Sequence, residues 1–109
     1  MPADRFTIHD LEVTLAERAQ GSADNSYTRK LLDKGIGHCA KKLGEEAVET
    51  ALAAVSEDRD RVISEASDLL YHLLVVLRAR EIAFAEVEAA LSDRVGISGL
   101  AEKASRPRA

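Results

Sequence analysis

Two stretches with helical periodicity, residues 36–55 and 59–80, dominate this chain and leave only a short break at residues 56–58 between them. Within each stretch, apolar side chains recur three or four residues apart, which places them along one face of an α-helix. Because the break is so short, the second helix is expected to run antiparallel beside the first. The sequence therefore predicts a helical hairpin at the centre of the fold.

Shorter helical patterns flank this hairpin on both sides. Thr7 can cap a helix that begins at residue 8, with Asp10 at the capping-box position. Ser26 can cap a short helix that ends at Gly35, since glycine is the preferred residue just past a helix end. A last helical pattern covers about residues 84–95.

Evidence for strands is nearly absent, because the β-branched run Val75-Val76 lies inside a helical pattern. We therefore predict an all-α fold, an antiparallel helical bundle. Its 109 residues suit one domain, which we expect over residues 1–95, followed by a C-terminal tail over residues 96–109.

Composition excludes several classes of protein. The 19 acidic and 15 basic residues give a formal net charge of −4, which argues against a general nucleic-acid binder. A single cysteine, Cys39, allows no internal disulfide and fits a reducing compartment, where we expect it to be a small buried hydrophobic residue. With no signal-peptide pattern and no apolar run of membrane-spanning length, the expected location is cytoplasmic, with no membrane contact.

Two carboxylate pairs stand out on the long helices, Glu46 with Glu49 and Glu65 with Asp68. Each pair has i, i+3 spacing, so both of its members lie on one helix face, and the hairpin brings the two pairs together. Residues 45–68 hold eight acids and only two bases, so salt bridges within the region cannot balance the charge. Clustered hard oxygen ligands point to Mg²⁺ or Mn²⁺, and the alternative is a solvated acidic face.

Other candidate residues give weaker signals. His72 follows the second pair by one helical turn, and we expect it to be a hydrogen-bonded neighbour of the site more often than a metal ligand. Tyr27 is expected to pack with its hydroxyl on a partner, with ligand stacking as a second possibility. A basic segment from Arg29 to Lys42 precedes the acidic one, and bases beside a metal site suit a polyphosphate ligand.

These motifs together resemble the all-α nucleoside triphosphate pyrophosphatase superfamily, the MazG-like group, and within it the phosphoribosyl-ATP pyrophosphatase family. The resemblance covers roughly residues 6–95. The motifs that carry it are Glu46-x-x-Glu49, fifteen intervening residues and Glu65-x-x-Asp68, the Ser26-Tyr27-Thr28 segment, residues 42–49 and residues 68–72. Glu81 departs from the family, because a helix-ending glycine is common at that position.

The resemblance implies a role for each matching residue. Glu46, Glu49, Glu65 and Asp68 would be Mg²⁺ ligands, with Mn²⁺ as a possible substitute. Glu45 would hold a metal-bound water or a second ion, and Glu45 or Glu49 would accept a proton from the attacking water. The implied substrate-binding residues are Ser26, Tyr27, Thr28, Lys42 and His72, of which Lys42 and the Ser26–Thr28 segment would face the phosphates.

The implied reaction is Mg²⁺-dependent hydrolysis of 1-(5-phosphoribosyl)-ATP to 1-(5-phosphoribosyl)-AMP and pyrophosphate, the second step of L-histidine biosynthesis. Two alternatives stay open. The chain could be a house-cleaning pyrophosphatase of free (d)NTPs, which shares the chemistry. It could also be a non-catalytic helical dimerisation module whose acidic face binds a basic partner.

Two long helices with a few short ones cannot enclose a bundle core by themselves. Apolar residues in the ranges 69–77 and 87–91 therefore suggest a homodimer that completes a four-helix core.

Overall fold

The computed structural model describes residues 5–21 and 26–96, and within these ranges it contains five α-helices and no strand. The helices are α1 (Ile8–Arg18), α2 (Tyr27–Asp33), α3 (Ile36–Ser56), α4 (Arg59–Ala79) and α5 (Phe84–Val95). The all-α prediction is confirmed, and the two long helices end within one residue of their predicted bounds. Of the predicted tail, residues 97–109 lie outside the described residues.

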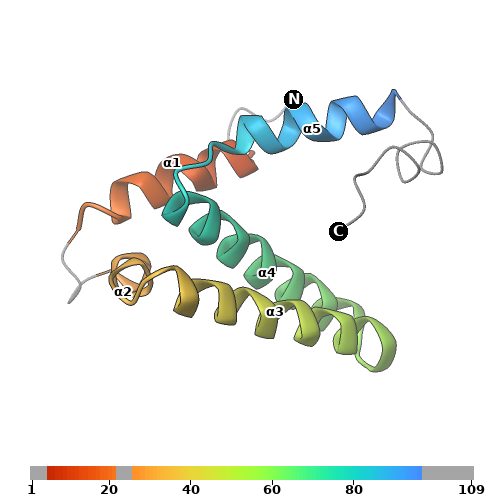
Figure 1. Ribbon diagram of the computed structural model, residues 1–109. Helices are drawn as coiled ribbons and strands as arrows, with labels where there is room; N and C mark the ends of the chain where they lie inside the picture. The colour runs from red at the N-terminus through yellow and green to blue at the C-terminus, as the bar shows by residue number, and fades with distance from the viewer. Residues whose placement is uncertain (1–4, 22–25, 97–109) are drawn as a thin grey trace, which may run out of the picture.

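The two long helices form the predicted hairpin (Figure 1). Each is 21 residues long, and only Glu57 and Asp58 connect them. The Asp58 carboxylate accepts a hydrogen bond from the backbone N–H of Arg61 at 2.9 Å and so caps α4 at its first turn. Most tertiary contacts of the chain join α3 to α4, so this hairpin is the scaffold on which the other helices pack.

Local capping signals fix the two short helices at the N-terminal side. Thr7 and Asp10 form the predicted capping box, with the Thr7 N–H donating to Asp10 Oδ2 at 2.9 Å. Ser26 caps α2 through the Arg29 N–H at 3.1 Å, and its own hydroxyl donates to the Arg18 carbonyl at 3.0 Å. Gly35 has a φ of 91°, a left-handed conformation that glycine adopts readily and that lets α2 turn directly into α3.

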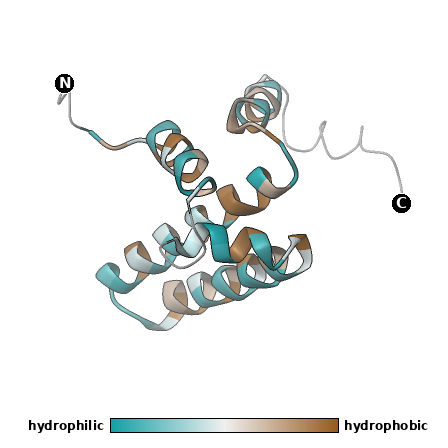
Figure 2. Ribbon diagram, turned by 90° about the vertical axis from the view of Figure 1, so that its left-hand side faces the viewer, coloured by the Kyte–Doolittle hydropathy of each residue, from teal (hydrophilic) through white to brown (hydrophobic). Residues whose placement is uncertain are grey.

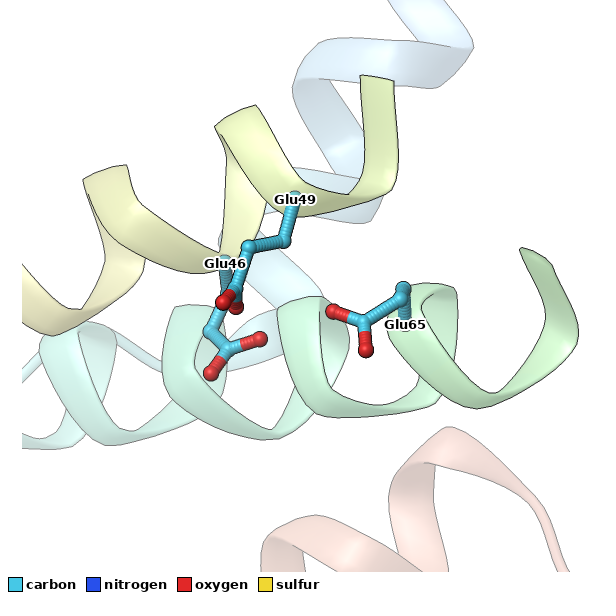
Figure 3. Close-up of side chains that lie close together, drawn as sticks. All are labelled: Glu46, Glu49 and Glu65. Carbon is cyan, nitrogen blue, oxygen red and sulfur yellow. The ribbon is translucent and has the colours of Figure 1, made fainter. Parts of the chain in front are cut away.

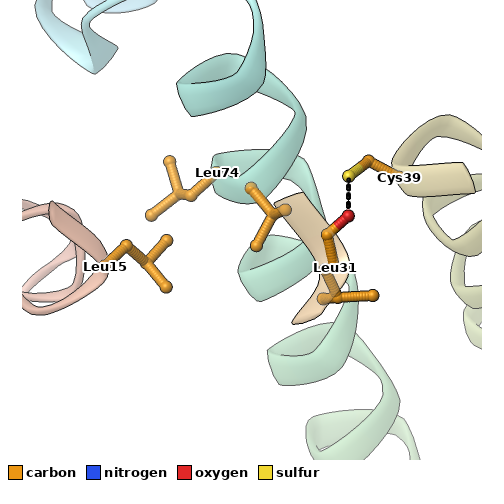
Figure 4. Close-up of a cluster of buried hydrophobic side chains, with 5 residues drawn as sticks. Leu15, Leu31, Cys39 and Leu74 are labelled. Carbon is orange, nitrogen blue, oxygen red and sulfur yellow. Dashed lines mark hydrogen bonds between the residues drawn. The ribbon is translucent and has the colours of Figure 1, made fainter. Parts of the chain in front are cut away.

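The hydrophobic core lies where α3 begins and α4 ends, with α1 and α2 packed against it (Figure 4). Its buried members are Leu15, Leu31, Cys39, Leu74 and Val75. The Cys39 thiol donates to the Leu31 carbonyl at 3.2 Å, and burial raises the pKa of this thiol above its ordinary value. Cys39 is therefore the small buried residue that the sequence predicts.

The C-terminal end of α4 includes a residue in the left-handed backbone conformation, which glycine usually adopts at helix ends. Glu81 has a φ of 58°, in the left-handed region. The N–H of Ile82 donates to the Leu77 carbonyl at 2.9 Å and the N–H of Glu81 donates to the Arg78 carbonyl at 3.1 Å, which is a Schellman motif. Glu81, where the family commonly has glycine, therefore still ends the helix, but its left-handed backbone conformation is strained.

Apolar side chains also remain exposed along the hairpin and α5. Hydrophobic residues recur along both long helices and along α5 (Figure 2). The exposed large ones on these helices include Val48, Leu52, Val55, Ile63, Leu91 and Val95. None of the described helices combines the length and the apolar character needed to cross a membrane.

Candidate metal centre

The polar faces of α3 and α4 meet inside the hairpin. Glu46 and Glu49 extend from α3 toward Glu65 on α4 (Figure 3). One carboxylate oxygen from each residue can be chosen so that all three lie within 4.8 Å of one another. Glu65 is buried, Glu46 is half-buried and Glu49 is exposed, so the cluster opens to solvent on the Glu49 side.

Three buried polar atoms around this cluster have no hydrogen-bond partner among the described residues. They are Glu46 Oε2, Glu65 Oε2 and His72 Nε2. A buried polar group without a partner costs about 1–3 kcal/mol, and an uncompensated charge costs more. Two of the three atoms are carboxylate oxygens, the preferred ligands of Mg²⁺, so the donor set fits a hard divalent cation.

Burial and the neighbouring carboxyls both act on the pKa of Glu46. Burial raises the pKa of this carboxyl, and the adjacent Glu49 carboxyl and the charge of Asp68 raise it further. Asp68 therefore lies close enough to act on Glu46, although its exposed side chain is not one of the three that converge within 4.8 Å. The structure thus brings together three of the four predicted ligands, and the role of all four as metal ligands stays a prediction.

Two neighbours that sequence reasoning missed hold the acidic residues in place. The Thr50 hydroxyl lies 2.7 Å from the Glu46 carbonyl and 3.1 Å from the Glu65 carbonyl, so it joins α3 to α4 beside the cluster. The Arg61 guanidinium lies 3.3 Å from Glu65 Oε1. The i, i+4 spacing of Arg61 and Glu65 could have predicted this ion pair. Nothing local in the sequence marks Thr50, because its role depends on how the two helices align.

A surface hollow of about 650 Å³ adjoins the cluster on α3. It is lined by Lys42, Gly44, Glu45, Glu46, Val48 and Glu49. Lys42 Nζ lies 3.6 Å from Glu45 Oε1, so these two predicted site residues are ion-paired at the rim. A ligand in this hollow would meet one ammonium group and the carboxylates of the cluster.

The Ser26–Thr28 segment lies near His72, since the ring centroids of Tyr27 and His72 are 6.3 Å apart. The Ser26 and Thr28 hydroxyls form hydrogen bonds within the chain, the first with Arg18 and the second with the Tyr71 hydroxyl at 2.6 Å. His72 is buried, and its Nδ1 lies 2.9 Å from the Asp68 carbonyl. Burial raises the pKa of Tyr71, so its phenol keeps a proton to share with Thr28. The substrate-binding roles of these residues remain predictions.

Comparisons with known proteins find one family model and several similar proteins. A family model described as phosphoribosyl-ATP pyrophosphohydrolase matches residues 8–95. A protein of Bradyrhizobium diazoefficiens named phosphoribosyl-ATP pyrophosphatase 1 is 64% identical over 102 residues, which are 94% of this chain and 96% of that protein. Two proteins named phosphoribosyl-ATP pyrophosphatase are also similar. That of Azorhizobium caulinodans is 60% identical over 99% of both chains, and that of Nitrobacter hamburgensis is 59% identical over 95% of this chain and 97% of its own.

Proposed function

The chain belongs to the phosphoribosyl-ATP pyrophosphohydrolase family, and we propose that it hydrolyses 1-(5-phosphoribosyl)-ATP to 1-(5-phosphoribosyl)-AMP and pyrophosphate, the second step of L-histidine biosynthesis. The structural observation that carries this proposal is the cluster of Glu46, Glu49 and Glu65, which contains two buried carboxylate oxygens without partners among the described residues. A solvated acidic face would leave its carboxylate oxygens in water, so the burial supports a working site.

The cofactor is Mg²⁺, held by Glu46, Glu49, Glu65 and Asp68, with Mn²⁺ able to replace it. The hard oxygen ligands support this choice. Burial and then the neighbouring carboxyls raise the pKa of Glu46 by disfavouring its charged form, which a divalent cation would stabilise. When bound, such a cation neutralises phosphate oxygens and lowers the pKa of a coordinated water.

The chain's own side chains supply positioning and proton transfer. Glu49 is the exposed member of the cluster, so its carboxylate can reach a water molecule at the open side and accept its proton. Glu45 is a second candidate for this role at the rim of the hollow. The ammonium of Lys42, at the same rim, can move from Glu45 to a phosphate oxygen of the substrate.

A homodimer completes the fold around this site. Val48, Leu52 and Ile63 are more than half exposed on the hairpin, and Val95 at the end of α5 is 89% exposed. A second copy would remove this apolar surface from water and complete a four-helix core, which is the usual way in which a helical hairpin buries a second face. The cytoplasmic location remains a prediction.

Pyrophosphate release from phosphoribosyl-ATP, measured with and without Mg²⁺ beside dCTP and ATP, tests the proposed function. We expect Mg²⁺-dependent release from phosphoribosyl-ATP and little from the other two nucleotides. Release from dCTP alone would keep the site but assign it to the removal of free nucleotides. If no nucleotide released pyrophosphate, the chain would be a non-catalytic dimerisation module.

A further inference from the structure

Three aromatic rings form a layered cluster beside the metal centre. The ring of Tyr27 stacks on that of Tyr71, with centroids 6.2 Å apart and planes inclined by 19°. The His72 ring stands edge-on to both, at centroid distances of 6.3 Å from Tyr27 and 5.1 Å from Tyr71. Tyr27 is the outermost of the three, with 53% of its surface exposed, while His72 is buried.

The inner layers of this cluster are fixed by hydrogen bonds. Thr28, which is only 1% exposed, holds the Tyr71 hydroxyl at 2.6 Å, and the Asp68 carbonyl holds His72 Nδ1 at 2.9 Å. Tyr27 therefore rests on a support whose side chains cannot easily rotate. A ring held in this way can bind a flat ligand with little loss of conformational entropy.

The exposed ring lies within reach of the acidic cluster. The His72 ring stands edge-on to Tyr27, and its Nδ1 lies 2.9 Å from the carbonyl oxygen of Asp68, the second residue of the Glu65–Asp68 pair on α4. Tyr27 therefore lies near the turn of α4 that follows the Glu65–Asp68 pair, so an extended nucleotide can meet both. In the Ser26–Thr28 segment both hydroxyl side chains are buried, so the Tyr27 ring is the side chain that this segment presents to a ligand.

The proposed substrate offers a matching surface. Its adenine carries a second phosphoribosyl group on one edge, which restricts recognition at that edge, whereas both faces of the purine remain flat. A nucleobase stacks on an aromatic ring through such a face, and the contact contributes substantially to binding. We propose that Tyr27 binds the adenine base of the substrate by stacking, and that Thr28 and Tyr71 are positioning residues that hold this ring in place. This inference rests on the proposed function.

A tryptophan substitution allows the contact to be observed directly. The chain contains no tryptophan, so Tyr27→Trp introduces a single fluorescent reporter at the proposed contact. We expect AMP to quench its fluorescence, while ribose 5-phosphate and pyrophosphate at the same concentration leave it unchanged. Quenching by all three compounds alike, or by none, would overturn the stacking contact.

Calorimetric titrations separate base binding from phosphate binding. We expect Tyr27→Leu to weaken AMP binding about tenfold, since one stacked base contributes that much or more. Tyr27→Phe, which keeps the ring, and Phe6→Leu, which removes another exposed ring, should both bind AMP as the wild type does. Pyrophosphate affinity should be the same in all four proteins.

Three results would refute the inference. Unchanged AMP affinity in Tyr27→Leu would show that the ring does not contact the base. Equal weakening of AMP and pyrophosphate would show that Tyr27 only maintains the shape of the site. A change in oligomeric state of Tyr27→Leu, seen by gel filtration, would show that the ring contacts a second copy. Lack of phosphoribosyl-ATP hydrolysis by the wild type would refute the proposed function alone, because the AMP titrations decide the stacking contact independently.

Discussion

Tyr71→Phe tests how α2 is held against the hairpin. The substitution removes one hydroxyl and leaves the ring, so the 2.6 Å contact with Thr28 is lost while the aromatic stack remains. Thr28 is 1% exposed, so its hydroxyl would lose this partner in a place that water does not reach. An unsatisfied buried hydroxyl costs about 1–3 kcal/mol. For a domain of this size we expect the melting temperature to fall by about 5–15 °C.

Removal of the other hydroxyl of this pair is the matched control. Thr28→Val keeps the shape of the buried side chain and leaves the hydroxyl of Tyr71, a half-buried residue, to bond with water instead. Its cost should be smaller, about 1 kcal/mol or less, and the double variant should be more stable than the sum of the single losses predicts. Urea unfolding of the four proteins measures these differences. Equal losses in both single variants, or strict additivity in the double variant, would refute this reasoning.

Three further predictions concern the metal, pH and the end of α4. Mg²⁺ at about 100 times its dissociation constant should add about 2.7 kcal/mol to the free energy of unfolding. Glu65→Gln should reduce this gain. A melting temperature of the wild type that Mg²⁺ leaves unchanged would favour a non-catalytic module. In the metal-free protein, burial and the Glu49 carboxyl raise the pKa of Glu46, so the protonated form is favoured on folding. The contribution of Glu46 to stability should therefore be fully present below the ordinary value of 4.5 and be lost as the pH rises through the raised pKa. Urea unfolding of Glu46→Gln should lack this contribution, and the same dependence on pH in both proteins would exclude Glu46 as its source. Glu81→Gly should raise stability by about 0.5–1 kcal/mol, because glycine tolerates a φ of 58°, and a lower melting temperature would contradict the strain at this position.

Local signals in the sequence were sufficient to predict the helices. Thr7, Ser26 and Gly35 mark helix ends through side-chain hydrogen bonds or backbone conformations that depend only on near neighbours. The short break after residue 55 likewise requires an antiparallel pair. For the same reason, helical spacing and the short break were enough to predict that the carboxylates of Glu46 and Glu65 approach each other.

Contacts between distant residues could not be predicted in this way. Thr28 and Tyr71 are 43 positions apart, and their hydrogen bond depends on how α2 settles against α4. The hydrogen bonds of Thr50 depend on the register of α3 against α4. Helical periodicity also gives the polar and apolar faces of a helix without saying which one meets its neighbour. Here the acidic faces meet inside the hairpin, while Val55 on α3 is 87% exposed.

The initial rate of pyrophosphate release from phosphoribosyl-ATP by Glu49→Gln, at saturating Mg²⁺, tests most directly whether the acidic cluster performs the reaction. Glu88→Gln is the matched control, because it makes the same change of charge at an exposed position on α5. We expect Glu49→Gln to lose about a hundredfold or more in rate while its circular dichroism remains helical, and Glu88→Gln to match the wild type. A Glu49→Gln protein that keeps more than about half of the wild-type rate would contradict the assignment of this cluster as the active site.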